Sequence, residues 1–292
     1  MAIEQAKRNA GRHDWRGWYL NFLNQPLAQR SRGFHAISEG EMAMTAELIA
    51  SFLDLDPSAD IVLDVGCDSA VVSRFVARRC RRFAGVNFIP AMLIEADRQN
   101  AAASRYPAWF AAADGRLLPF PAGVFSKAYC SDMMHTLPNH EDALKLIREL
   151  LRVCRPGGEA LVTSIPDVHK KFQGKLLALR RARWNEKWRV MLHLLIPRPA
   201  IRIMRRLFRL KPRYDLEYLE FDLDKMKKQL DAEGLRCDIL DFPTDYWSED
   251  YRLTRSNLLI RIPPDSAGRT PAPRSNPPRF VPPPPAPKET LF

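Results

Sequence analysis

Short apolar runs alternate with longer amphipathic stretches over residues 45–165, and turn residues separate the two. The apolar runs predict strands at 61–65, 83–87, 109–112, 128–131 and 159–164. The stretches between them repeat apolar residues every three or four positions, which predicts helices at 71–79, 89–102 and 140–153. Strands that alternate with helices of this length are typical of βαβ units. We therefore expect an α/β fold, mainly a parallel sheet with helices on both faces.

The regular alternation stops at Pro166, and the pattern divides the chain into five parts. We expect a helical lid at 1–44, the core at 45–165, a helical insertion at 166–220, a closing helix and two strands of the core at 221–262, and a tail at 263–292. The aromatic residues of the first part could equally pack against the core. Eleven of the 30 tail residues are proline, which predicts disorder or polyproline structure.

The charged residues are unevenly distributed along the chain, and the basic ones are concentrated in the insertion. The chain carries a net +11, but residues 170–213 contain fifteen Lys or Arg and one acid, Glu186, so this segment alone carries +14 and the rest about −3. Three explanations stay open for the insertion: a cap over the active site with its arginines in water, contact with an anionic membrane surface, or contact with nucleic acid. Because no nucleic-acid-binding module is visible, we do not expect a nucleic-acid partner.

The cysteines and the apolar runs bear on the cellular location of the protein. The five cysteines, at 67, 80, 130, 154 and 237, show neither metal spacing nor a disulfide framework, so we expect buried thiols and no metal site. The N-terminal residues lack the apolar region of a secretory signal, and no apolar run reaches the roughly 18 residues of a membrane span. We expect a cytoplasmic protein, with peripheral contact at the inner membrane surface as an option.

Candidate chemistry begins where the first strand runs into a glycine turn. Residues 63–70 read Leu-Asp-Val-Gly-Cys-Asp-Ser-Ala, and such a turn lets the backbone and the next helix N-terminus approach a nucleotide. Four further signals follow in order: Gly85-Val86-Asn87, then Ala113-Asp114-Gly115-Arg116-Leu117-Leu118-Pro119-Phe120-Pro121, then residues 131–138, and Arg-Val-Cys-Arg-Pro-Gly-Gly at 152–158.

The order and spacing of these five signals resemble the class I S-adenosylmethionine-dependent methyltransferases of the ubiquinone-biosynthesis and small-molecule type. Their pattern runs LDVGCGTG, then GVD, then D-A-x-x-L-P-F-P, then L-H-H-L-P, then R-V-L-K-P-G-G. The resemblance implies a Rossmann-like fold, S-adenosylmethionine as cofactor, and methyl transfer to a small or lipid-like acceptor. In that family the glycine loop faces the methionine part of the cofactor. The side chain that ends the second strand binds the ribose, here Asn87, and the Asp after the third strand contacts the adenine, here Asp114. The resemblance therefore assigns cofactor contacts to Asp64, Gly66, Cys67, Asp68, Asn87, Asp114, Gly115 and Ser131.

The sequence departs from the family pattern at two positions of the loop and at the end of the second strand. Asp68 and Ala70 stand where the family has glycines, and Asn87 stands where it has an acid. If position 70 needs a positive φ, an alanine there costs about 1 kcal/mol. These departures leave open the alternative of a non-catalytic protein of this fold that acts by binding partners. A nucleic-acid methyltransferase, in which the basic segment 170–213 would contact phosphates, is the third possibility.

His135 is the one histidine expected at the carboxyl end of a strand beside the crevice. Methyl transfer from a sulfonium needs mainly alignment, so a base helps only when the acceptor is a hydroxyl or a protonated nitrogen. His135 is our candidate catalytic residue, and a purely structural histidine is the alternative.

Overall fold

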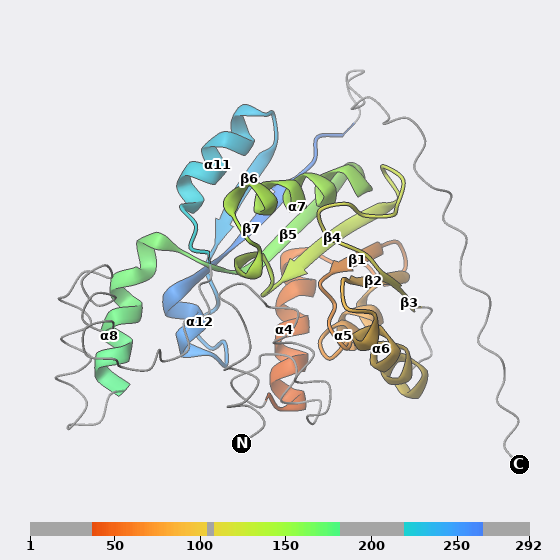
Figure 1. Ribbon diagram of the computed structural model, residues 1–292, viewed down its shortest axis with the longest axis horizontal. Helices are drawn as coiled ribbons and strands as arrows, with labels where there is room; N and C mark the ends of the chain where they lie inside the picture. Colours follow the sequence, from red (N-terminus) through yellow and green to blue (C-terminus); the bar gives the residue numbers. More distant parts are fainter. Residues whose placement is uncertain (1–36, 104–107, 182–218, 265–292) are drawn as a thin grey trace, which may run out of the picture.

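The computed structural model describes residues 37–103, 108–181 and 219–264. These residues form one seven-stranded sheet flanked by helices (Figure 1). The strands are β1 (Ile61–Val65), β2 (Arg82–Asn87), β3 (Ala108–Ala112), β4 (Phe125–Ser131), β5 (Cys154–Pro166), β6 (Arg236–Leu240) and β7 (Arg255–Arg261). The helices are α4 (Glu39–Phe52), α5 (Ser73–Val76), α6 (Pro90–Ala103), α7 (His140–Val153), α8 (Lys171–Arg181), α11 (Leu223–Ala232) and α12 (Glu249–Thr254), with short 3₁₀ turns η1 (Ala77–Arg79), η2 (Met134–Thr136) and η3 (Val168–Lys170).

The strand order is β3-β2-β1-β4-β5-β7-β6. Neighbouring strands from β3 to β5 pair in parallel, while β7 runs antiparallel to both β5 and β6. The expected mainly parallel sheet is therefore confirmed. The order reverses between β1 and β4, and a crevice opens at such a reversal because the loops there diverge to opposite faces.

Alternation along β1 divides the core into two halves. Leu63 and Val65 belong to a cluster with the apolar residues of α7 and α11, whereas Val62 packs with residues of α4 and α5. Figure 1 shows α7 and α11 on one side of the sheet and α4, α5 and α6 on the other. The expected helices on both faces are present because successive side chains of a strand point to opposite faces.

Most expected elements are present, with shifts at their ends. The helix expected at 140–153 is confirmed, and the side chain of Asn139 caps it by accepting from the backbone N–H of Asp142 at 2.8 Å. The helix expected at 71–79 is instead a short α5 followed by the 3₁₀ turn η1. Helix α12 was not expected at all. Among the described residues, no helix has both the length and the apolar character to cross a bilayer.

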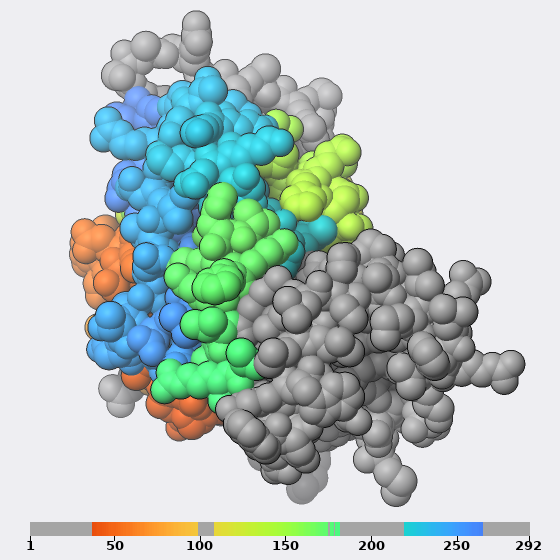
Figure 2. Space-filling model, turned by 90° about the vertical axis from the view of Figure 1, so that its left-hand side faces the viewer, coloured from red at the N-terminus to blue at the C-terminus, as the bar shows by residue number. Residues whose placement is uncertain are grey.

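The insertion begins with η3 and α8, which lie against the C-terminal part of the chain. Arg181 forms an ion pair with Glu249 of α12 at 2.8 Å, and Lys170 forms one with Asp241 at 2.5 Å. In Figure 2 the green segment that contains α8 accordingly lies against the blue segments of the C-terminal part. The expected lid up to residue 36, the rest of the insertion at 182–218 and the tail from 265 lie outside the described residues.

Candidate cofactor-binding site

A cavity of about 260 Å³ opens at the carboxyl ends of β1, β2, β3 and β4, where the strand order reverses. Six of the eight predicted cofactor residues line it: Gly66, Asp68, Asn87, Asp114, Gly115 and Ser131. Apolar walls come from several elements, among them Val65, Val86, Ile89, Met92, Met133, Leu137 and Leu146. A mainly apolar cavity with a few polar groups is typical of small-molecule sites.

The loop after β1 keeps a left-handed backbone although only one of its residues is glycine. The φ angles are +89° at Gly66, +52° at Asp68 and +58° at Ala70. Position 70 therefore does need a positive φ, which is unfavourable for alanine because its Cβ approaches the next carbonyl oxygen. Asp68 tolerates this region better, since its side chain bonds locally and accepts from the backbone N–H of Ser69 at 2.7 Å.

Asp64 and Cys67, also predicted as cofactor contacts, do not line the cavity. Asp64 Oδ2 accepts hydrogen bonds from the Ser73 hydroxyl at 2.6 Å and from the Tyr129 hydroxyl at 2.7 Å. Burial raises the pKa of Asp64 to about 6. Cys67 is buried with its sulfur directed toward β2, where a Cβ at Gly85 would lie 2.9 Å from it. The role of both residues in cofactor binding stays a prediction. In the structure, Asp64 links β1 to Ser73 of α5 and to Tyr129 of β4.

Asn87 ends β2 and lines the cavity, but half of its side chain is already engaged. Its Oδ1 accepts from the backbone N–H of Ile89 at 2.9 Å, just before α6. The amide nitrogen and the second lone pair of Oδ1 therefore remain for a ligand. An amide nitrogen can donate to a ribose oxygen but cannot accept from a ribose hydroxyl.

Asp114 follows β3 and holds an arginine that sequence reasoning did not select. The guanidinium of Arg116 binds both carboxylate oxygens of Asp114, with a shortest contact of 2.6 Å, and its Nη1 reaches Asp142 Oδ2 at 2.7 Å. The hydrogen bonds from Arg116 hold the pKa of Asp114 below its usual range. Arg116 itself lines the cavity.

Asp132, at the end of β4, is the third aspartate that lines the cavity. Asp132 has a φ of +54°, and its carboxylate accepts from the Tyr251 hydroxyl at 2.7 Å and from Arg255 Nη1 at 2.5 Å. Arg255 also donates to the carbonyl of Ser164, which has a φ of +60°. Strained backbone at the ends of two neighbouring strands is common at functional sites. Sequence reasoning missed Asp132 and Tyr251 because no local signal links residues so far apart in the chain.

His135 lies next to the cavity but does not line it. It is 8% exposed, and its Nδ1 is 3.9 Å from Asp132 Oδ1. The backbone carbonyl of His135 accepts from the N–H of Leu219, which ties η2 to the segment before α11. The catalytic role of His135 therefore stays a prediction.

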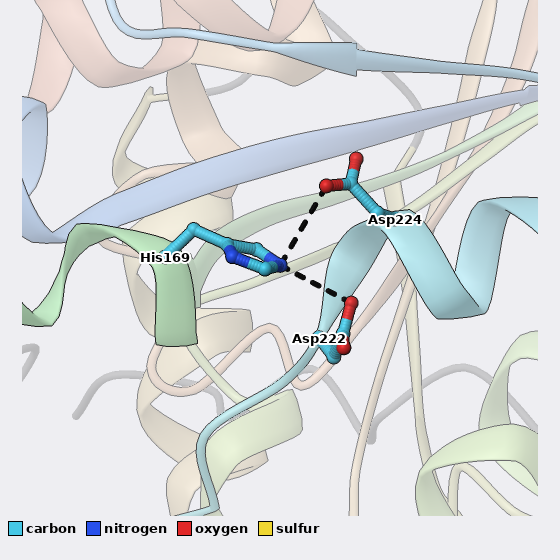
Figure 3. A group of neighbouring side chains, drawn as sticks. All are labelled: His169, Asp222 and Asp224. Carbon is cyan, nitrogen blue, oxygen red and sulfur yellow. Dashed lines mark hydrogen bonds and ion pairs between the residues drawn. The ribbon is translucent and has the colours of Figure 1, made fainter.

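One group of described side chains has the composition of a metal site. His169 Nε2 lies 3.3 Å from Asp222 Oδ1 and 3.6 Å from Asp224 Oδ2 (Figure 3). All three are exposed and none lines the cavity. Asp222 already caps α11 by accepting from the N–H of Lys225. An ion pair at a helix N-terminus explains this group. Carboxylates are favourable at a helix N-terminus, whereas a bound metal ion is unfavourable there.

Comparisons with known proteins agree with this geometry. Residues 62–158 match the family model described as a methyltransferase domain. The chain is 30% identical to an uncharacterized methyltransferase of Mycobacterium sp. (strain JLS) over 133 residues, which are 46% of this chain and 50% of that protein. It is 32% identical to the probable methyltransferase PMT27 of Arabidopsis thaliana over 113 residues, which are 39% of this chain and 12% of that protein. The chain thus spans half or less of the length of these relatives.

Among solved structures, phosphoethanolamine N-methyltransferase 1 of Haemonchus contortus, in complex with phosphoethanolamine and S-adenosylhomocysteine, shares this fold with a TM-score of 0.60. The identity is 13%, and the match covers 92% of this chain and 52% of that one, so it speaks for the fold alone. Fold, family model and relatives point the same way. Residues 62–158 therefore match a methyltransferase domain, and the described residues share the fold of an S-adenosylhomocysteine-bound methyltransferase.

Proposed function

We propose that the protein binds S-adenosylmethionine in this cavity and transfers its methyl group to a small or lipid-like acceptor. One observation carries the proposal: the ends of β1, β2 and β3 bring Gly66, Asn87 and Asp114 around a single cavity at the reversal of strand order. Ligands of open α/β sheets bind at that place.

The residues present fit the cofactor in two respects. The backbone at Gly66, Asp68 and Ala70 keeps the left-handed turns that the family forms with glycines, so the path of the loop is preserved. Gly66 also packs closely against the segment that follows β4, since a Cβ there would lie 3.1 Å from Met133 Cγ. By the family resemblance, this loop would hold the methionine part and Asn87 the ribose. When bound, S-adenosylmethionine supplies a methyl group activated by its sulfonium.

The chain's own residues would then align the reactants and exclude water, which is most of what methyl transfer requires. Met133, Leu137 and Pro138 offer an apolar wall. Asp132, fixed by Tyr251, lies on the β4 side, where an acceptor would approach. His135 would accept a proton only from an acceptor that has one to lose.

Calorimetric titration of the full chain with S-adenosylmethionine and S-adenosylhomocysteine tests the proposal. We expect binding of both, with dissociation constants on the order of 10–100 μM because the altered loop loses some affinity. Gly66→Ala should weaken binding at least tenfold, since φ and space both oppose a side chain. Gly234→Ala is the matched control, because Gly234 lies at the end of α11 with a φ of +83°, and a Cβ there would meet nothing within 4 Å. No heat at hundreds of micromolar ligand would instead favour a non-catalytic protein that binds partners.

The proposals of a lipid-like acceptor and of peripheral contact with anionic membranes are supported by the exposed side chains of α8. This first helix of the basic segment exposes Phe172 at 71% and Leu176 at 57%, one turn apart. The side chains of Lys171 and Arg180 are 45% and 81% exposed. Exposed apolar and basic residues on one helix support binding to an anionic lipid surface.

Sedimentation with phosphatidylserine-containing vesicles tests this part. We expect the protein to sediment at low salt and less at high salt, because exposed charges are screened within about 10 Å at 0.1 M. Replacing Phe172 and Leu176 with serine should reduce binding, whereas Ile94→Ser, on α6 with 58% exposure, should not. Equal sedimentation of all variants would contradict a membrane role for α8.

A further inference from the structure

Within the chain, Arg116 contacts both carboxylate oxygens of Asp114. Asp114 Oδ1 accepts from the backbone N–H of Arg116 at 2.9 Å and from Arg116 Nε at 2.9 Å. Its Oδ2 accepts from Arg116 Nε at 3.1 Å and from Nη2 at 2.6 Å. A carboxylate offers about four lone-pair sites. Three N–H groups of Arg116, one of them shared between the two oxygens, therefore engage the group to which the resemblance assigns the adenine contact.

Arg116 is held from a second direction as well. Its Nη1 donates to Asp142 Oδ2 at 2.7 Å, and the Asp142 side chain is only 12% exposed in the first turn of α7. Leu146, one turn further along α7, lines the same cavity as Arg116 and Asp114. The guanidinium thus spans from the loop after β3 to α7, with a carboxylate at each end, along the wall of the cavity.

We infer that Arg116 is the residue that contacts the nucleobase, and that Asp114 is a positioning residue that acts by holding Arg116. The inference rests on the proposed function, because it concerns the same ligand and the same cavity. A guanidinium is planar and packs well on an aromatic face. It has five N–H groups and no acceptor, and the Nε, Nη1 and Nη2 bonds described above engage three of them.

This assignment has a chemical consequence for specificity. A donor-only group can bond to N3 or N7, which accept in adenine and hypoxanthine alike, but cannot accept from the exocyclic amino group of adenine. The site should therefore discriminate poorly between adenine and hypoxanthine, in which an oxygen replaces that amino group. A site in which Asp114 accepted from the amino group would instead prefer adenine, because the deaminated base presents an oxygen and not an N–H donor to the carboxylate.

Calorimetry of the full chain with S-adenosylhomocysteine and with its deaminated counterpart S-inosylhomocysteine tests the inference without any variant. We expect the two dissociation constants to agree within about threefold. Arg116→Ala should weaken both ligands by about tenfold, and Arg116→Lys should not restore binding, because an ammonium cannot span two carboxylates. Asp114→Asn should have the same effect, and the double variant should add nothing further. Arg148→Ala is the matched control, since Arg148 is 60% exposed on α7 and pairs with Glu233 instead.

Two results would overturn the inference and leave the proposed function standing. One is binding of S-inosylhomocysteine more than about 100-fold weaker than that of S-adenosylhomocysteine. The other is tighter binding of S-adenosylhomocysteine by Arg116→Ala, as expected if the freed Asp114 accepts from the amino group. Failure of the unaltered protein to bind either ligand would overturn the proposed function and the inference together.

Discussion

The hydroxyl of Tyr129 in β4 donates to Asp64 Oδ2 in β1 at 2.7 Å, and both side chains are buried. Ser73 of α5 donates to the same oxygen. A single buried carboxylate oxygen therefore joins two central strands and the helix that follows the cofactor loop. Two hydroxyl donors do not fully replace water around a charge, which is why burial raises the pKa of Asp64 to about 6.

Asp64→Asn should remove a pH dependence of stability. Because the folded-state pKa lies above the ordinary value of 3.8 for an aspartate, the folded protein gains stability as the pH falls from about 6 toward 4. An asparagine oxygen can accept from both hydroxyls without a charge. We expect the variant to unfold at neutral pH with a free energy equal to or higher than that of the parent, by up to about 2 kcal/mol. Urea unfolding between about pH 4 and 8 measures this, and a variant that keeps the parent's pH profile would show that Asp64 is not the titrating group.

Ala70→Gly should stabilise the protein. The φ of +58° at Ala70 is strained for alanine, and glycine relieves that strain while losing part of the gain to chain entropy. We expect an increase of up to about 1 kcal/mol in the free energy of unfolding. Ala77→Gly, in η1 where φ is negative, is the control and should destabilise instead. A decrease at both positions would mean that the methyl group of Ala70 contributes more by packing than its backbone loses by strain.

Asn87 should affect both the ligand and the fold. Asn87→Asp keeps the bond to the N–H of Ile89 and turns a second carboxylate oxygen toward the ribose, so we expect S-adenosylhomocysteine to bind about fivefold to tenfold tighter. Asn87→Ala loses that bond, so binding should weaken and the free energy of unfolding should drop by about 1 kcal/mol. Calorimetry and thermal unfolding measured together separate the two effects. Unchanged affinity in both variants would remove Asn87 from the site.

His169 should make stability depend on pH near neutrality. The hydrogen bond with Asp222 raises the pKa of His169 above 6.5, so its stabilising contribution is full below that pH and is lost as the pH rises through the folded-state pKa. His169→Gln should therefore unfold at a lower temperature than the parent at about pH 5.5, and the difference should vanish by about pH 8.5. We expect a small effect because the side chain is 55% exposed. Measuring with a chelator and with added zinc shows whether a metal contributes, and a constant difference across the pH range would contradict the ion pair.

The sequence by itself determined the order of the main strands and helices of the core and the resemblance to methyltransferases, because both depend on local signals. The apolar period of 140–153 and its cap at Asn139 define α7, and the turn residues after each strand define the motif series. The end points of strands could be predicted less well. β4 begins at Phe125, before the expected residue 128, because pairing with β1 and β5 extends it beyond its own apolar run.

Only the tertiary structure decided which of the motif residues face the cavity. Asp64 and Val65 are neighbours in the motif, yet the pleat of β1 directs one toward Tyr129 and the other into the cavity. The contact between Arg116 and Asp142 could not be predicted either, since it depends on how α7 packs against the loop after β3. The spacing of motifs along the chain predicts which residues lie at the end of each strand. Packing between elements that are distant in sequence decides where each side chain points. The same packing decides which hydrogen-bond partner each side chain already has.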